Sequence, residues 1–489
     1  PLLLNASLEA ATNFMAAVSV LEIDKKKITG IRSVESWQRN YPRDNHLANM
    51  LGYLDNERRG ISGIEAMFDD IMTAQPGKLE FRRDVRGRPL PGGRIVVRPP
   101  RNGANIHLTI ISPLQQIMED KMRLLVEKYR PEHAYALMLN RQTGAVMAVV
   151  QYPQFNPNDR NTMLPENLPN HALYKCYEPG SIMKGLSIAC AIENRCVSLA
   201  TEYDCENGHW RYGGRALRDS HGYGVLSVAK IIQKSSNIGT AKIALDMGEE
   251  LTYKGLAAFC LGQPTGVGFY PAGEKARVFA NESRGLFKPL KYWDTLTVTR
   301  MPIGQGLSLT PWQIIQAWSA LANGGVMMQP YIVEKVVYPD GHTVYSQPHC
   351  KATPISRETA QLMTSALKLV TQKEGTGRSA AVKGYEIAGK TGTAQIWVPA
   401  DPVSKSKGYY SNSMHFSSFV GFAPADEPAF VLLVSAENPK GKFRTGGAVC
   451  GETFASIAKS TLEYLQIPPQ LDPAEERKQL SRPKTVSLR

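Results

Sequence analysis

The sequence predicts an α+β catalytic domain, with helices on a mostly antiparallel sheet, preceded by a smaller β-rich domain. Three observations support this prediction: a hairpin-like segment over residues 134–150, three further strand-like segments late in the chain, and helical segments with apolar stripes around them. We divide the chain into an N-terminal domain over residues 1–105, a catalytic domain over 106–467 and a polar C-terminal tail over 468–489.

Composition excludes some classes of protein and leaves others open. The chain has 489 residues, of which 43% are apolar and 21% are charged, as is ordinary for a globular protein. Its net charge of +13 suits an anionic partner, but no zinc-ligand spacing and no interleaving of basic and aromatic residues indicates nucleic acid. We therefore interpret the charge as a solubility feature beside anionic lipid or an acidic polymer, and we expect no nucleic acid partner.

The cysteines and the N-terminal residues bear on the cellular compartment without settling it. The seven cysteines include no C-x-x-C pair, so no zinc or thioredoxin-type site is expected, and their odd number leaves at least one thiol unpaired in a monomer. No segment reaches the roughly 18 uninterrupted apolar residues of a membrane span. The chain also begins without methionine, so we interpret it as a soluble portion trimmed from an upstream signal anchor.

The N-terminal domain carries no cluster typical of a catalytic site. Residues 60–65 predict a turn that leads into a helix over 66–72. The stretch over 82–101 is rich in arginine and is punctuated by glycine and proline, which favours hairpins over helix. Such a basic stretch is either an anionic contact surface or, more commonly, the solvated face of a β-rich domain.

The catalytic domain begins with a helix that has a clear start signal. Ser112 is expected to cap this helix, Pro113 suits its first position, and Gln115 would complete a capping box. Residues 134–150 then predict two strands joined at the turn over 142–144. The mixed apolar character of these strands fits a sheet that helices cover.

The stretch around which the chain is organised is Tyr177–Gly185, which precedes an apolar run. A Pro-Gly turn lies before Ser181, so we expect this serine to be the N-cap of a helix. Lys184 lies three residues further along and would share a helical face with Ser181, within hydrogen-bond reach. Because a desolvated, neutral lysine can take the proton of a serine hydroxyl, Ser181 is a candidate acyl-transfer nucleophile.

Ser-x-x-Lys alone is a weak signal, since it also occurs at five places where a surface serine and a solvated lysine are the ordinary explanation: Ser227/Lys230, Ser365/Lys368, Ser404/Lys407, Ser456/Lys459 and Ser481/Lys484. The pattern after the Pro-Gly turn differs from these because two further motifs lie downstream of it. A helix over 226–233 would deliver Ser235 and Asn237, and a strand over 386–395 would carry Lys390. The other expected elements are strands over 416–422 and 429–435 and helices over 312–322, 357–370 and 454–464.

Ser181-x-x-Lys184, Ser235-x-Asn237 and Lys390-Thr391-Gly392, in this order and widely spaced, resemble the three-motif signature of penicillin-binding proteins and serine β-lactamases. Over nearly its whole length the chain is similar to class B penicillin-binding proteins, D,D-transpeptidases that cross-link bacterial peptidoglycan. The resemblance implies their transpeptidase fold after a non-catalytic, dimerisation-like pedestal. Residues 234–239 are closer to the septal, cell-division enzymes than to the elongation enzymes.

The resemblance implies a role for each residue of the first two motifs. Ser181 would attack the penultimate D-Ala carbonyl of a peptidoglycan stem peptide, and an amine from a neighbouring strand would resolve the acyl-enzyme. Lys184 would be the general base, with a pKa lowered by burial and by the second cation, Lys390. Ser235 would relay a proton to the leaving amine, and Asn237 would hold the substrate amide and Lys184.

The strand that carries the third motif would bind the substrate. Lys390 and the hydroxyls of Thr391 and Thr393 suit the terminal carboxylate of D-Ala-D-Ala, and Gly392 would let the strand approach the ligand closely. The backbone N–H groups of Ser181 and Thr393 would form the oxyanion hole. β-Lactam antibiotics mimic this substrate and should acylate the serine, and no metal or organic cofactor is expected.

The resemblance also implies partners and a location. We expect a membrane glycan polymerase and other division proteins as partners. The catalytic domain would lie on the periplasmic side of the inner membrane, anchored by a segment outside this sequence. Three alternatives stay open: an elongation-type transpeptidase, a β-lactamase, carboxypeptidase or β-lactam sensor that shares the motifs, and a silent scaffold that binds partners through residues 1–105.

Overall fold

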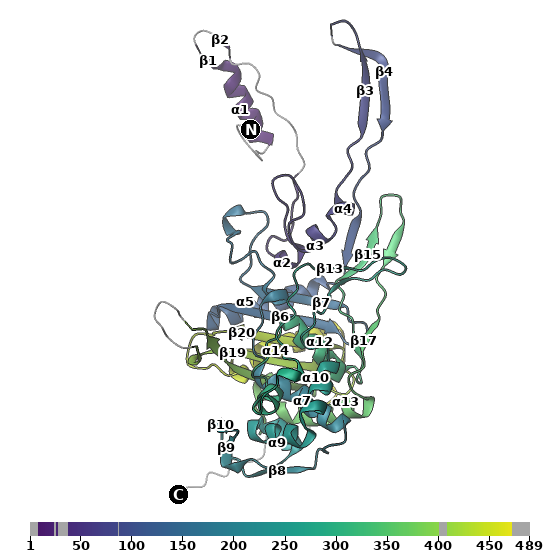
Figure 1. Ribbon diagram of the computed structural model, residues 1–489. Helices are drawn as coiled ribbons and strands as arrows, with labels where there is room; N and C mark the ends of the chain where they lie inside the picture. The colour runs from purple at the N-terminus through teal and green to yellow at the C-terminus, as the bar shows by residue number, and fades with distance from the viewer. Residues whose placement is uncertain (1–7, 24–25, 28–37, 87, 401–407, 472–489) are drawn as a thin grey trace.

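Figure 1 shows the computed structural model of the protein, which describes residues 8–23, 26–27, 38–86, 88–400 and 408–471. A body of helices around a central sheet carries helix α1 (Leu8–Val20) and the hairpin of β3 (Lys78–Arg83) and β4 (Pro89–Arg98), which both extend from one end. The expected tail falls outside the described residues from position 472 onward. No helix among the described residues is long and apolar enough to cross a membrane.

The predicted antiparallel sheet is confirmed. Its five strands lie in the order β18-β19-β20-β6-β7, and each neighbouring pair is antiparallel. The hairpin expected over 134–150 forms one edge, and the strand that carries Lys390 forms the other. The strands are β6 (His133–Asn140), β7 (Val146–Tyr152), β18 (Ala388–Val398), β19 (Tyr409–Ala423) and β20 (Phe430–Glu437).

Helices cover both faces of this sheet and divide the core into two layers. One face carries α5 (Ser112–Tyr129) and α14 (Gly446–Tyr464), and the other carries α7 (Met183–Glu193), α12 (Pro311–Ala322) and α13 (Arg357–Thr371). Because the sheet is covered on both faces, β20 is buried along its whole length and its sequence does not alternate between apolar and polar residues.

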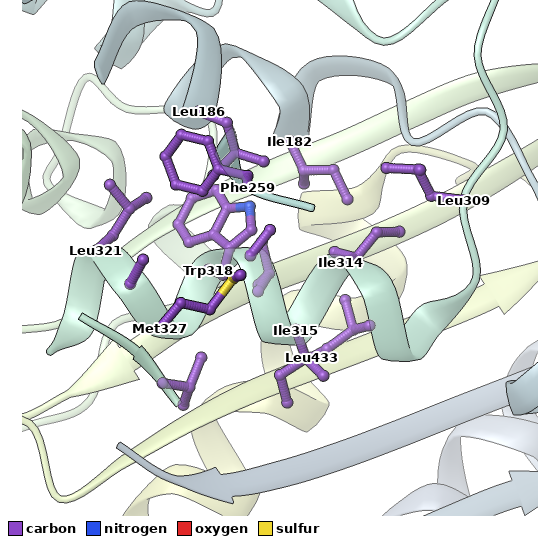
Figure 2. Packing of buried hydrophobic residues seen from close by; sticks show 14 of the residues in the cluster. Ile182, Leu186, Phe259, Leu309, Ile314, Ile315, Trp318, Leu321, Met327 and Leu433 are labelled. Atoms are coloured by element: carbon purple, nitrogen blue, oxygen red, sulfur yellow. The ribbon is translucent and has the colours of Figure 1, made fainter. Parts of the chain in front are cut away.

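Helix α12 supports the helix that comes after the candidate nucleophile. In Figure 2, Ile315 of α12 points toward Leu433 of the sheet, and Trp318 points toward Leu186 of α7. This contact requires Gly185 in α7, because a Cβ at that position would lie 2.8 Å from the Trp318 ring. This close apolar packing holds α7 against α12.

The start of α5 differs from the prediction. Ser112 caps no amide of this helix, and Ile111 occupies the N-cap position. The Gln115 side chain instead donates to the Val149 carbonyl at 2.8 Å and accepts from the Val149 N–H at 2.9 Å. Both backbone groups of this β7 residue are buried and need partners, so the glutamine ties the helix to the sheet rather than to its own first turn. A capping box does occur at the start of α12.

The helices predicted in the catalytic domain are confirmed with shifted ends. The helix expected over 226–233 is α8 (Val228–Lys234), and the last helix begins at Gly446 rather than at residue 454. Helices α9 (Asn237–Met247) and α10 (Glu249–Ala258) pack beside α7. The short elements are α6 (His171–Tyr174), α11 (Thr297–Arg300), β8 (Glu202–Asp204), β9 (His209–Tyr212), β10 (Arg215–Arg218), β11 (Val225–Ser227), β12 (Gly268–Phe269), β13 (Arg277–Val278), β14 (Met327–Met328), β16 (Thr343–Tyr345) and β17 (Cys350–Ala352).

The N-terminal region contains short helices and the projecting hairpin. The helix predicted over 66–72 is divided into α3 (Gly63–Met67) and α4 (Asp69–Met72), because Phe68 between them turns inward and is fully buried. The hairpin prediction is confirmed by the antiparallel pairing of β3 with β4. The remaining short elements are β1 (Glu22–Ile23), β2 (Lys26–Lys27) and α2 (Ala48–Leu51).

The chain joins the catalytic body at β5 (Asn105–Leu108). This strand pairs with β15 (Val333–Val337), which lies more than two hundred residues later in the sequence. The backbone at the expected domain boundary therefore belongs to a sheet shared with the later part of the chain. The division of the chain at residues 105 and 106 stays a prediction.

Candidate active site

The candidate nucleophile lies in a tight turn before α7, and this corrects the prediction that it caps the helix. Ser181 belongs to a 3-10 turn over Gly180–Ile182, and the side chain of Ser181 caps no amide. Gly180 adopts a left-handed φ of +57°, and a Cβ there would lie 3.1 Å from the carbonyl oxygen of Thr393. The turn is therefore pressed against strand β18, and this contact, rather than a helix cap, determines the position of the serine.

Lys184 is fully buried, and its amine contacts the second motif. Nζ donates to the Ser235 carbonyl at 2.5 Å, to the Asn237 Oδ1 at 2.7 Å and to the Ser235 Oγ at 3.2 Å. Within the described chain, no hydrogen bond joins this amine to the Ser181 hydroxyl, so the predicted direct contact is not made in this state. Three acceptors match the three donors of an ammonium group.

Burial dominates the electrostatics of Lys184. Loss of solvent lowers the pKa of this amine to about 7, against the opposing effects of Asp219 and Cys205. At neutral pH a large fraction of the amine is therefore uncharged and able to accept a proton. The expected lowering of its pKa by burial agrees with this result, whereas Lys390, the second expected cause, is not among the groups that shift it; the charge effect between the two lysines lowers the pKa of Lys390 instead.

The second motif occupies a turn between two helices. Helix α8 ends at Lys234, and Ser235 takes a left-handed conformation with φ 61°. Ser236 then caps α9 by accepting the Gly239 N–H at 2.9 Å. The sharp turn directs the Ser235 and Asn237 side chains toward Lys184, as the motif predicts.

Lys390 reaches the same serine from the sheet. Its Nζ donates to the Ser235 Oγ at 2.8 Å, and the side chain is fully buried. Burial, and then the nearby charge of Lys184, hold the pKa of Lys390 well below its ordinary value. Two lysines from different elements therefore share one serine hydroxyl. Neither the periodicity nor the spacing of the sequence could predict this arrangement.

The residues after Lys390 depart from the expected arrangement. Side chains alternate along a strand, so Thr391 and Thr393 face the start of α14 while Lys390 faces α7. The Thr391 Oγ1 lies 2.9 Å from the Thr376 Oγ1, and the Thr393 Oγ1 accepts the Gly446 N–H at 2.9 Å. The structure therefore does not gather these two hydroxyls and the Lys390 amine on one side of the strand. Thr393 is exposed, whereas Thr391 is buried.

Gly392 serves the packing of the site. A Cβ at this position would lie 2.4 Å from the Ser418 Oγ and 3.0 Å from the Pro179 carbonyl oxygen. The glycine thus lets β18 approach the nucleophile turn, whereas the sequence suggested a close approach to the ligand. Any larger residue would push the strand and the turn apart.

A loop from elsewhere in the chain completes the turn. Gly304 lies so close that a Cβ on it would be 2.1 Å from the Gly180 carbonyl oxygen. Glu178 accepts the Gly306 N–H and the Tyr410 hydroxyl, each at 2.9 Å, and burial raises the pKa of this carboxyl. Sequence reasoning assigned no role to Glu178, although it belongs to the same conspicuous stretch as Ser181.

Asp219 is the main residue that sequence reasoning missed. Its Oδ1 accepts the N–H groups of Asn237 at 2.5 Å and Ile238 at 3.2 Å, and its Oδ2 accepts the Ser236 hydroxyl at 2.6 Å. The sequence indicated only a polar loop at this position. Asp219 lies 18 residues before Asn237, with β11 and α8 in between, so no local sequence signal indicated this role.

The Ser365/Lys368 pair shows why most Ser-x-x-Lys patterns are unrelated to chemistry. Both residues lie on α13, and Ser365 is exposed. Partial burial disfavours the Lys368 charge, but the hydrogen bonds that its amine donates to Asp426 and Glu386 outweigh burial and raise the pKa of this lysine. Such a lysine stays charged and cannot act as a base at neutral pH.

All seven cysteines are free thiols, and the described residues contain no group of three or more His, Cys, Asp or Glu side chains that could hold a metal ion. The Cys205 Sγ lies 3.3 Å from the Oγ of Ser236 in the second motif.

The chain matches two known families of protein domain. Residues 134–459 match the family of the penicillin-binding protein transpeptidase domain, and residues 12–108 match the penicillin-binding protein dimerisation domain. The chain is 32% identical over 475 residues to the stage V sporulation protein D of Bacillus subtilis, across 96% of this chain and 70% of that protein. It is 29% identical over 448 residues to the peptidoglycan D,D-transpeptidase FtsI of Escherichia coli, across 91% of this chain and 71% of that protein.

The fold is shared with a solved structure as well. Penicillin-binding protein 3 of Mycobacterium tuberculosis, complexed with ampicillin, superposes with a TM-score of 0.75 at 28% identity, across 89% of this chain and 91% of that chain. The prediction of a transpeptidase domain preceded by a smaller N-terminal domain is therefore confirmed.

Proposed function

The chain belongs to the penicillin-binding protein transpeptidase family and is a peptidoglycan D,D-transpeptidase, and from this premise we propose that Ser181 is the nucleophile of a serine acyl-enzyme mechanism. The Ser181 Oγ attacks the penultimate D-Ala carbonyl carbon, the peptide bond breaks, and the terminal D-Ala leaves as an amine. An amine of a second stem peptide then attacks the ester, forms the new amide and frees the serine. Two acyl transfers thus replace one difficult amide exchange.

Lys184 is the proposed general base. A neutral amine has two N–H groups, and the two short bonds to the Ser235 carbonyl and the Asn237 Oδ1 satisfy both. The lone pair is then free to take the Ser181 proton when substrate closes the site, since catalytic hydrogen bonds are often long before substrate binds. Its pKa of about 7 suits this role, because a catalytic base works best near the ambient pH.

Ser235 is the proposed relay to the leaving amine. Its Oγ accepts from the Lys390 amine at 2.8 Å and lies 3.2 Å from the Lys184 amine, so its own O–H is able to donate, to the neutral Lys184 amine or to the leaving nitrogen. Asn237 positions Lys184 and has the amide groups to hold the substrate backbone. Lys390 orients the relay hydroxyl, because its amine donates to the Ser235 Oγ at 2.8 Å.

The oxyanion hole and the carboxylate site are proposed on either side of β18. The backbone N–H groups of Ser181 and Thr393 are candidates for the oxyanion hole, and the packing of the nucleophile turn on β18 supports this choice. The terminal carboxylate of D-Ala-D-Ala lies beside the hydroxyls of Thr391 and Thr393 and along the backbone of Gly392. The N-terminus of α14 adjoins these hydroxyls and favours an anion there.

The observation that carries this proposal is the pair of buried lysines that share the Ser235 hydroxyl, one of them a single turn after Ser181. A silent scaffold has no reason to bury two lysine amines together, because burial removes the hydration of each. This favours an active enzyme over a scaffold that only binds partners. A hydrolase or a β-lactam sensor would share the pair of lysines and is distinguished by the fate of the acyl group.

We propose septal cell-wall synthesis, on the pattern of residues 234–239, with elongation as the alternative. The proposed partners are a membrane glycan polymerase and other division proteins. The proposed location is the periplasmic side of the inner membrane, through an anchor outside this sequence. β-Lactams are proposed as inhibitors, since the related M. tuberculosis protein was solved in complex with ampicillin.

The test is labelling with a fluorescent penicillin, with the modified residue read by mass spectrometry. We expect a stable adduct on Ser181 that is lost in Ser181→Ala and greatly slowed in Lys184→Ala. Ser365→Ala is the matched control, because it removes the serine of an unrelated Ser-x-x-Lys pattern and should label normally. Absence of an adduct on folded protein would refute the acyl-enzyme proposal, and rapid release of hydrolysed penicillin would favour a hydrolase.

A further inference from the structure

We propose that Asp219 is a positioning residue for this reaction, which holds the Ser235–Asn237 turn in place and sets the charge environment of the Lys184 amine. The proposal rests on the assignment of Lys184 as the general base. Asp219 belongs to none of the three motifs. It comes directly after β10, sixteen residues before Ser235 in the sequence.

The first part of the argument is geometric. One carboxylate accepts three hydrogen bonds from three successive residues, namely the Ser236 hydroxyl and the N–H groups of Asn237 and Ile238, at 2.6, 2.5 and 3.2 Å. The two N–H groups belong to the first turn of α9, where no carbonyl of the helix can accept them. Asp219 therefore fixes both the start of α9 and the turn that projects Ser235 toward the lysines.

The same segment selects which atom of Asn237 faces the base. The Asn237 Nδ2 donates to the carbonyl of Arg218 at 2.7 Å, so the Oδ1 points to the Lys184 amine, also at 2.7 Å. An inverted amide would place N–H groups against the amine and would lose both bonds. The Arg218 carbonyl thus orients the Asn237 side chain, and the Asp219 carboxylate holds the Asn237 backbone N–H.

The second part of the argument concerns charge. The titratable groups that act on the pKa of the Lys184 amine are Asp219 and Cys205, from the loops before α8, and Lys390 from β18 shares the Ser235 hydroxyl with it. Asp219 stabilises the ammonium form and so raises the pKa of Lys184 against the larger effect of burial. Removal of the Asp219 charge should lower the pKa of the base, and the neutral, active form would then persist to lower pH.

The test is the pH dependence of Ser181 acylation by a fluorescent penicillin in Asp219→Asn. Asparagine keeps an oxygen that can accept the N–H groups of α9 and removes the negative charge. We expect the midpoint of the acid limb to fall by about one pH unit, the lower end for an opposite charge near a base. The rate at high pH should fall as well, because a weaker base removes the proton less readily.

Two controls separate charge from structure. Ser236→Ala removes one hydrogen bond to the same carboxylate and leaves the charge, so its rate should fall with the midpoint unmoved. Asp246→Asn removes an acid of α9 whose carboxylate accepts the Tyr203 hydroxyl, and it should behave as wild type. An unmoved midpoint in folded Asp219→Asn would overturn the proposal.

Failure of this inference is distinguishable from failure of the proposed function. If wild-type protein does not label on Ser181, the acyl-enzyme proposal falls and this inference falls with it. If wild type labels and Asp219→Asn has the wild-type midpoint, only the role of Asp219 is wrong. Should Asp219→Asn not fold, Asp219→Glu provides the test, since it keeps the charge and changes the reach. The proposal then requires a reduced rate at an unmoved midpoint, and an unchanged rate overturns it.

Discussion

Substitution of Gly304 by alanine tests whether the loop behind the nucleophile turn sets the reactivity of Ser181. Gly304 has a left-handed φ of +84°, and an added Cβ would lie 2.1, 2.4 and 2.6 Å from the O, N and C atoms of Gly180. A left-handed alanine costs about 1–2 kcal/mol. Overlap with close-packed atoms adds roughly 1–3 kcal/mol. We therefore expect Gly304→Ala to lower the free energy of unfolding by about 2–5 kcal/mol in urea denaturation.

The matched control is Gly306→Ala in the same loop. Gly306 is also left-handed, with φ +75°, but an added Cβ would meet no atom within 4 Å. This variant should lose only the backbone contribution of about 1–2 kcal/mol and should acylate at nearly the wild-type rate. Gly304→Ala should acylate at least tenfold more slowly, because the displaced Gly180 precedes Ser181. Equal stability and equal acylation rates in the two variants would refute the argument from close approach.

Three further predictions concern other parts of the molecule. Acylation should be half-maximal near pH 7 and should fall about tenfold per pH unit below it, because Lys184 must lose its proton to act as base; a flat profile between pH 5 and 8 would contradict this. Glu178→Ala should slow acylation about tenfold while Glu178→Gln retains most activity, since glutamine still accepts from Tyr410; equal losses would show that the charge, rather than the hydrogen bonds, matters. Phe68→Ala should lower the free energy of unfolding by about 3–5 kcal/mol and Phe81→Ala by under ~0.5 kcal/mol, because Phe68 is fully buried and Phe81 is 46% exposed on the projecting hairpin. Comparable losses in urea denaturation would mean that the hairpin packs against the body in solution.

Local sequence patterns predicted most of the sheet and the long helices. The strand over 134–140 and its partner after the turn at 142–144 were evident because a polar turn interrupts two apolar runs. The helix from Pro311 was evident from its length, its apolar content and the glycines that end it. These signals depend only on residues near one another in the chain, so no tertiary information was needed.

Predictions about individual side chains were less successful, because a side chain chooses among partners that the sequence does not order in space. Gln115 has the spacing of a capping residue, yet it pairs with a buried strand backbone that needs both of its hydrogen bonds. Ser181 has the position of an N-cap, yet contact with β18 draws it into a 3-10 turn. In both cases a long-range contact was stronger than the local preference.

The sequence by itself determined the family and the chemical types at the site, because the order of three short motifs is a local property of the chain. Only the tertiary structure decided how those groups act on one another. It buried Lys184 and Lys390 around one hydroxyl, turned the threonines of β18 away from Lys390, and brought Asp219 to the start of α9. The physical reason is that a pKa depends on burial and on neighbouring charges, and both of these arise from residues far apart in the sequence.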